Sequence, residues 1–223
     1  MKMTVFNQFL ISIGFTDLRT KTTEALEEIL NKIYAFCEAK YGRVLEAFFT
    51  ESWQPNKNIK RGVTEGLDVH HKPEYDPANP EVCSLSDPVT AKDWYLRGYT
   101  HYQLPENLVY CNWIEHQAIH AIIDILRMRQ FGAYRPGCIE LRRAGVLNRY
   151  FNEGEDYLQT MESNEAFKSR AYFIKALTNC EDELETYQLI MDEWAYAVGI
   201  DCWFVFGQTL ESIENCFETY VED

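Results

Sequence analysis

One stretch in the middle of the chain constrains the fold more than any other. The apolar run Leu108–Cys111 is typical of a strand, and it leads directly into Asn112, a residue type that often caps helices. Glu115, three positions later, completes a capping box. Apolar side chains then recur at helical spacing, so we expect a helix from Trp113 to Arg129 or Gln130 that ends near Gly132.

A second candidate strand, residues 66–71, precedes this stretch, and a long polar stretch with Pro77, Pro80 and Pro88 lies between the two. The rest of the chain has helical periodicity over four ranges: 20–49 with a weak point at Gly42, 158–177, 184–198 and 204–220. We therefore predict an α+β fold that is mostly α. Its three regions are an N-terminal helical segment (1–60), a strand–strand–helix unit with a basic extension (61–150) and an acidic helical subdomain (151–223).

All five histidines fall within 51 residues, at positions 70, 71, 101, 116 and 120. His116 and His120 are four residues apart on the expected helix, so they share one face and can bind one metal ion or simply lie at a helix surface. His70 and His71 lie in a candidate strand, where neighbouring side chains point to opposite faces. One of them could face a metal while the other approaches a substrate from a different direction.

Combined, these segments resemble the signature of the HNH endonucleases. The similarity is carried by His70-His71-x-Pro73, by PENLVY at 105–110 and by NWIEHQAIH at 112–120. It covers about residues 66–125 and is greatest to the nuclease colicins and to phage and prophage HNH proteins. The resemblance implies a ββα-metal finger that hydrolyses DNA phosphodiester bonds, of phage, mobile-element or defence origin.

The resemblance also implies a role for each residue. His71 would be the general base, and Asn107 would orient it by hydrogen bonding. His70, His116 and His120 would hold one divalent ion, whose identity among Zn²⁺, Mg²⁺, Mn²⁺ and Ni²⁺ stays open.

The sequence departs from compact HNH fingers in the long step of 36 residues from His71 to Asn107. The aromatic residues of this insert could stack on unpaired bases or pack over the strand pair; they are Trp94, Tyr95, Tyr99 and Tyr102. His101 is a candidate phosphate contact. Asp68 precedes His70 by two residues and thus shares its face of the strand, so it is a candidate partner for His70.

The net charge of −14 at first argues against a nucleic-acid enzyme. Residues 1–60 carry eight basic and seven acidic side chains, residues 61–150 ten and eleven, and residues 151–223 three and seventeen. The acidity therefore lies almost wholly in the last third. A basic stretch follows the candidate metal helix and supplies candidate phosphate contacts; they are Arg127, Arg129, Arg142 and Arg143.

The seven cysteines form no CxxC pair and are expected to be reduced and mostly buried. No apolar run approaches the roughly 18–20 residues of a membrane helix, and the N-terminus has no small-residue cleavage site, so we expect a cytoplasmic protein. Two other functions remain open. The chain could be a binding or inhibitor protein on an HNH scaffold, with residues 151–223 mimicking nucleic acid. It could also be an effector nuclease whose acidic part docks on a partner protein.

Overall fold

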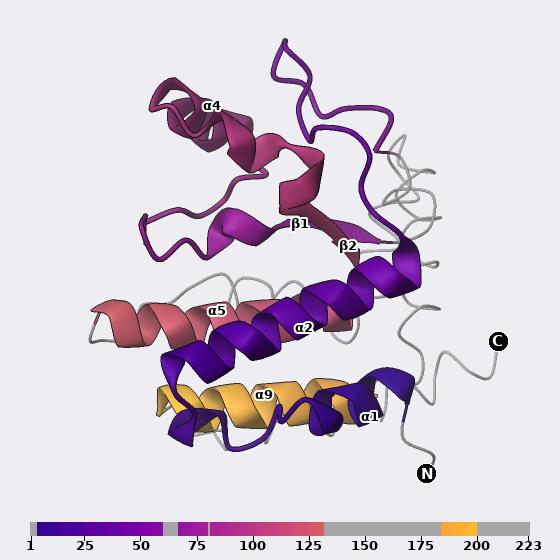
Figure 1. Ribbon diagram of the computed structural model, residues 1–223, viewed down its shortest axis with the longest axis vertical. Helices are drawn as coiled ribbons and strands as arrows, with labels where there is room; N and C mark the ends of the chain where they lie inside the picture. Colours follow the sequence, from indigo (N-terminus) through magenta and orange to yellow (C-terminus); the bar gives the residue numbers. More distant parts are fainter. Residues whose placement is uncertain (1–3, 60–66, 80, 132–183, 200–223) are drawn as a thin grey trace, which may run out of the picture.

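The computed structural model describes residues 4–59, 67–79, 81–131 and 184–199 (Figure 1). These residues form a mostly helical α+β structure with one small sheet, which confirms the predicted fold class. The elements in chain order are α1 (Val5–Ser12), η1 (Leu18–Thr20), α2 (Thr23–Tyr41), β1 (Asp68–His71), η2 (Lys72–Glu74), α4 (Pro88–Leu96), η3 (Thr100–Gln103), η4 (Pro105–Asn107), β2 (Leu108–Cys111), α5 (Trp113–Phe131) and α9 (Leu184–Val198).

The predicted capping box opens α5. The Asn112 side-chain oxygen accepts from the Glu115 backbone N–H at 2.8 Å, and the Asn112 N–H donates to Glu115 Oε2 at 2.7 Å. The Glu115 carboxylate is buried and also accepts from Lys40 Nζ at 2.7 Å and from the Tyr41 hydroxyl at 3.1 Å. One side chain therefore starts α5 and ties it to the end of α2.

Helix α2 ends at Tyr41, so the prediction that it continues through Val44, Leu45 and Phe48 is wrong. Gly42 adopts a φ of 80°, a conformation that favours glycine, and its N–H donates to the Glu38 carbonyl. The chain then turns, and Val44 and Phe48 pack with residues of the strand pair instead of extending the helix.

Strands β1 and β2 pair antiparallel, with His70 opposite Val109 and His71 opposite Leu108. Side chains of a strand alternate between faces, and here the two faces pack against different elements. On one face, Val109 and Cys111 join the main core with α2 and α5. On the other, Leu108 and Tyr110 pack with Val44 and Phe48. His70 lies on the first face and His71 on the second.

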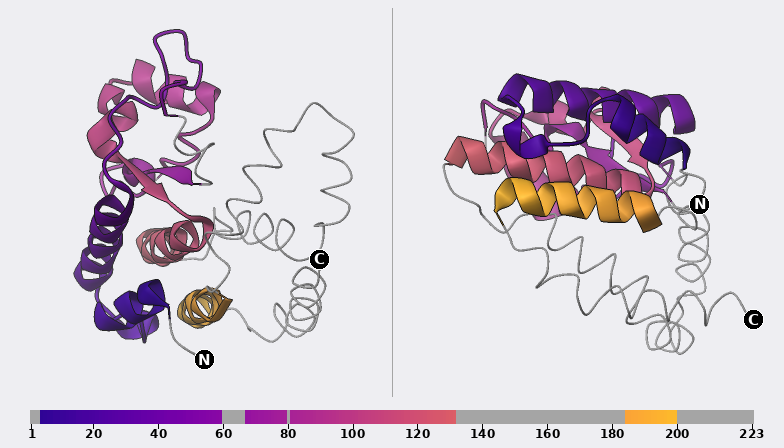
Figure 2. Two further views of the ribbon diagram at one scale, coloured as in Figure 1. Left: turned by 90° about the vertical axis from the view of Figure 1, so that its right-hand side faces the viewer. Right: turned by 90° about the horizontal axis from the view of Figure 1, so that it is seen from below.

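Among the described elements, helix α5 lies in the middle, with the strand pair on one side and α9 on the other, while α2 runs alongside (Figures 1 and 2). Every residue from Trp113 to Leu126 is buried. One hydrophobic core joins side chains of α1, α2, β2, α5 and α9, so described parts of all three predicted regions share it. Helix α9 matches the predicted range, whereas the helices expected at 158–177 and 204–220 lie outside the described residues.

The insert between the strands forms α4 and a small core of its own. Asp87 caps α4 by accepting from the Thr90 N–H, and Pro88 occupies its first turn. Trp94 and Tyr102 are buried with Val82 and Leu85, and Tyr99 packs against them. Trp94, Tyr99 and Tyr102 therefore pack within the insert itself and not over the strand pair, whereas Tyr95 is exposed and contacts Trp53.

The described residues bear on two further predictions, one about membrane helices and one about the cysteines. None of their helices combines the length and the apolar character needed to cross a membrane. Cys37 and Cys111 are buried and Cys83 is half-buried, and none of these three forms a disulfide. The other four cysteines lie outside the described residues.

Candidate metal centre

Three histidines converge between β1 and α5. His70 comes from the face of β1 that packs on the core, and His116 and His120 come from successive turns of α5. One nitrogen of each lies within 4.8 Å of one nitrogen of the others, and all three side chains are buried. The closest approach is 3.1 Å, between His70 Nδ1 and His116 Nε2. The structure thus brings together the three residues that the sequence predicted as metal ligands.

In two of these rings, the nitrogen that points away from the cluster contacts a neighbouring side chain. Asp68 Oδ2 lies 2.9 Å from His116 Nδ1, and because a carboxylate only accepts, Nδ1 carries the proton and donates. The Tyr34 hydroxyl lies 3.3 Å from His70 Nε2. The sequence suggested Asp68 as a partner for His70. The structure pairs it with His116 on α5, the helix that packs against this face of the strand pair.

This arrangement suits a cation. Since His116 Nδ1 donates to Asp68, His116 Nε2 is the unprotonated nitrogen, and it faces His70 Nδ1. These two nitrogens therefore either share a proton or hold a positive ion between them. A carboxylate behind a metal-binding histidine fixes the ring and makes it a better ligand. Asp68 occupies that place, and Glu74 Oε2 lies 3.7 Å from His120 Nε2. Three imidazoles beside two carboxylates fit a divalent transition metal such as Zn²⁺.

His71 lies on the other face of the strand pair. Its ring packs edge-on against Phe48 at 4.6 Å between centroids, and its Nε2 lies 3.0 Å from Gln103 Oε1. Gln103 Nε2 donates to the Leu85 carbonyl, so Oε1 is the atom that faces His71, and His71 Nε2 donates to it. Burial lowers the pKa of His71 to about 4, and the hydrogen bond to Gln103 opposes this shift. His71 is therefore a neutral imidazole near pH 7, with its lone pair on Nδ1.

Asn107 was predicted to orient His71, but its amide has another contact. Asn107 Nδ2 donates to the His101 carbonyl at 2.7 Å and thereby joins η3 to η4. The side chain that holds His71 is Gln103, which the sequence analysis did not single out. No local pattern marks it, because its role depends on the path of the insert that brings residue 103 beside β1.

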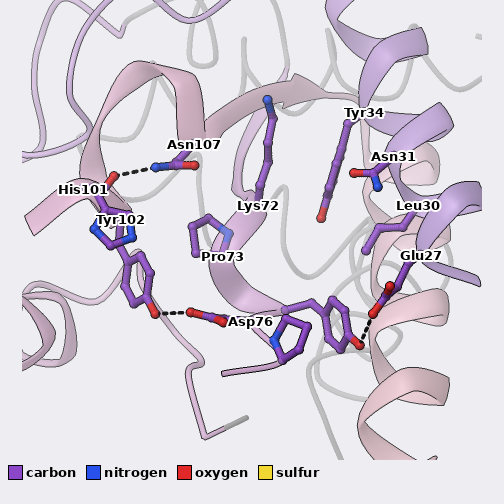
Figure 3. A pocket seen from close by; sticks show the side chains of 12 residues that line it. Glu27, Leu30, Asn31, Tyr34, Lys72, Pro73, Asp76, His101, Tyr102 and Asn107 are labelled. Carbon is purple, nitrogen blue, oxygen red and sulfur yellow. Dashed lines mark hydrogen bonds between the residues drawn. The ribbon is translucent and has the colours of Figure 1, made fainter. Parts of the chain in front are cut away.

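A cavity of about 390 Å³ lies next to the histidines, between α2, residues 72–77 and the turns at 101–107. Figure 3 shows its lining, with Tyr34 on the α2 wall and Lys72 beside it. The Tyr34 hydroxyl contacts His70, so this side chain links the cavity to the histidines. Lys72 Nζ is paired with Glu38 at 2.6 Å. The exposed residue His101 and the half-buried Asn107 also line the cavity.

The candidate phosphate contacts on α5 bind backbone carbonyls of this chain. Arg127 Nη2 donates to the carbonyls of Glu74 and Val82. Arg129 Nη2 donates to those of Leu18 and Arg19. Both side chains are half-buried and tie α5 to neighbouring loops. The other two candidates, Arg142 and Arg143, lie outside the described residues.

Known proteins give no further guide to this site. The chain matches no protein-family model, no curated protein and no solved structure.

Proposed function

We propose that this chain is a metal-dependent nuclease of the HNH type that hydrolyses phosphodiester bonds, with DNA as its expected substrate. The observation that carries the proposal is the convergence of His70, His116 and His120 between an antiparallel strand pair and a capped helix. This is the arrangement that the resemblance implies for a ββα-metal finger. The Asp68 carboxylate behind His116 adds support, because such outer partners typify metal-binding histidines.

A divalent ion at this site would stabilise negative charge on a phosphate and on the departing oxygen. The residues of the chain supply the rest. His71 would accept a proton from water at Nδ1, the nitrogen that is left unprotonated by its hydrogen bond to Gln103. Gln103 would keep the ring in this tautomer, in the role that the sequence analysis gave to Asn107.

One observation favours a second candidate function. His71 is only 1% exposed, with Phe48 and Gln103 against its ring, so water and substrate reach Nδ1 only if neighbouring side chains move. A non-catalytic protein that uses the metal to stabilise its fold needs no such movement. This second candidate corresponds to a binding protein on an HNH scaffold, with residues 151–223 as its partner-docking surface.

One experiment distinguishes the nuclease from the non-catalytic metal-binding protein. Purified protein is incubated with supercoiled plasmid and Mg²⁺, Mn²⁺, Ni²⁺ or Zn²⁺, and bound metal is measured in the same samples. We expect cleavage that is lost in His71→Ala without loss of metal, and lost together with metal in His120→Ala. Asp93→Asn on the exposed face of α4 is the control and should cleave normally. A metal-loaded wild type that cleaves with none of the four ions would overturn the nuclease proposal in favour of the structural one.

A further inference from the structure

A chain of hydrogen bonds runs from Asp68 through two of the histidines to Tyr34. Because Asp68 accepts from His116 Nδ1, His116 Nε2 carries no proton, and it faces His70 Nδ1 at 3.1 Å. In the metal-free protein, His70 Nδ1 must therefore donate to His116. A neutral imidazole has one N–H, so His70 Nε2 is then an acceptor, and the Tyr34 hydroxyl at 3.3 Å donates to it.

A bound ion reverses the last hydrogen bond of this chain. The ion takes the lone pair of His70 Nδ1, so the ring gives up its proton there and, to stay neutral, takes one up at Nε2. His70 Nε2 then donates, and the Tyr34 oxygen accepts. Tyr34 keeps its own proton in both states, because burial and then the negative charge of Glu74 raise the pKa of Tyr34. Metal binding therefore releases the Tyr34 O–H from His70 and leaves both side chains neutral.

The released hydroxyl belongs to a residue of the cavity wall. Tyr34 lines the cavity of about 390 Å³ and is 7% exposed. In Figure 3 its oxygen end lies between Pro73 and Leu30, two other residues of the lining. Within the part of the chain that the structure describes, His70 is the one hydrogen-bond partner of this hydroxyl. A buried O–H that no longer donates to His70 is costly unless a ligand accepts from it.

The other residues of the lining favour an uncharged ligand with flat faces. Glu27 and Asp76 both line the cavity, and each accepts a hydrogen bond from a tyrosine hydroxyl. The ammonium group of Lys72 is paired with Glu38 at 2.6 Å. The two carboxylates therefore make the cavity unfavourable for a phosphate. Its tyrosine rings can pack against a nucleobase, and its volume is within the range of about 300–1,000 Å³ that is usual for small-molecule sites.

We propose that the cavity binds a deoxynucleoside unit of the substrate when the metal site is occupied, through a hydrogen bond that the Tyr34 hydroxyl donates to a base or sugar oxygen. Tyr34 is not a metal ligand, so the ion keeps open positions for water and a phosphate oxygen. The inference rests on the metal-binding part of the proposed function. It adds a substrate contact that exists only in the metal-loaded protein.

The test uses the four deoxynucleosides as probes, with inorganic phosphate for comparison. Calorimetry measures their binding to the full-length protein, fully loaded with Zn²⁺ and again freed of metal by a chelator. We expect at least one deoxynucleoside to bind about 2- to 12-fold more tightly to the Zn²⁺ form, which corresponds to one hydrogen bond. Tyr34→Phe should lose this gain at full metal loading. Tyr95→Phe, which alters an exposed tyrosine of α4, is the control and should keep it.

Three results would overturn the proposal. The first is the absence of deoxynucleoside binding at millimolar concentrations, or equal binding with and without Zn²⁺. The second is a Zn²⁺-dependent gain that survives in Tyr34→Phe. The third is a gain that depends on Tyr34 for phosphate alone, because the ligand would then be the charged part of a nucleotide.

A second measurement on the wild type covers the case in which Tyr34→Phe does not fold. Nitrogen NMR of the protein with labelled histidines shows which ring nitrogen carries the proton. We expect His70 to be protonated at Nδ1 without Zn²⁺ and at Nε2 with it. Protonation at Nε2 in both states, or Zn²⁺ bound through Nε2, would overturn the proposal. Neither measurement involves phosphodiester cleavage, so a failure of the nuclease proposal would leave these results unaffected.

Discussion

Asp68 Oδ2 accepts a hydrogen bond of 2.9 Å from His116 Nδ1, across 48 residues of sequence. The contact joins the first residue of β1 to the first turn of α5. It sets which nitrogen of His116 faces His70, and so it determines whether the two rings can hold a cation.

The first prediction concerns this contact. We expect Asp68→Asn to lower the affinity for Zn²⁺ by about 10- to 100-fold, because an amide is a weaker acceptor that no longer fixes the ring. Competition with a coloured chelator measures the change. Asp93→Asn, which alters an exposed aspartate of α4, is the control and should bind like the wild type. Equal affinity in all three proteins would contradict the role given to Asp68.

The second prediction concerns stability. Because the three histidines come together only in the folded chain, Zn²⁺ at 100 times its dissociation constant should stabilise the protein by about 2.7 kcal/mol. Thermal or urea unfolding with and without chelator measures this gain. We expect His120→Ala to abolish it and His101→Ala, a histidine outside the cluster, to retain it. If His120→Ala were stabilised as much as the wild type, the ligand assignment would be wrong.

The third prediction concerns pH. The pKa of His71 is about 4 in the folded state and about 6.5 when unfolded, so the unfolded chain binds more protons between these values. The contribution of His71 is therefore complete above pH 6.5 and is lost as the pH falls toward 4, by about 3 kcal/mol. Urea unfolding should show the chelator-treated wild type losing about 3 kcal/mol more stability than His71→Gln as the pH falls from 7 to 4. Parallel stability curves would refute it.

The fourth prediction concerns Arg127. Removing its side chain leaves the carbonyls of Glu74 and Val82 without this donor, so Arg127→Ala should lower the free energy of unfolding by about 1–3 kcal/mol. The salt dependence of DNA binding should keep the slope of the wild type, because the guanidinium is engaged within the protein. Arg97→Ala, at the exposed residue that follows α4, is the control for stability. A stable Arg127→Ala variant with a shallower salt slope would instead make this arginine a phosphate contact.

Local signals in the sequence predicted the elements that build the site. The capping box at Asn112 and Glu115 located the start of α5, and periodicity gave the range of α9. The histidine spacing anticipated the cluster, since residues four apart on a helix share a face whatever the tertiary context. The same signals overextended α2 past Gly42 and did not identify α1 or α4.

The side chains that contact these residues could not be predicted from the sequence. Gln103 beside His71, Tyr34 beside His70 and Glu74 beside His120 are side-chain contacts between separate elements. Each depends on how an insert or a helix lies over the strand pair, and a pattern along the chain does not encode that. Arg127 and Arg129 illustrate the same limit, because no pattern along the chain indicates that backbone carbonyls lie beside both guanidinium groups.

The buried carboxylate of Glu115 has one more consequence. It caps α5, the helix on which the next residue is His116. It also accepts hydrogen bonds from Lys40 and Tyr41 at the end of α2, the helix whose Tyr34 contacts His70. The backbones that bear the histidines are therefore arranged as the chain folds, before any ion arrives. Such preorganisation means that little entropy is left to be lost when the metal enters, so tight binding does not require a rearrangement of the helices.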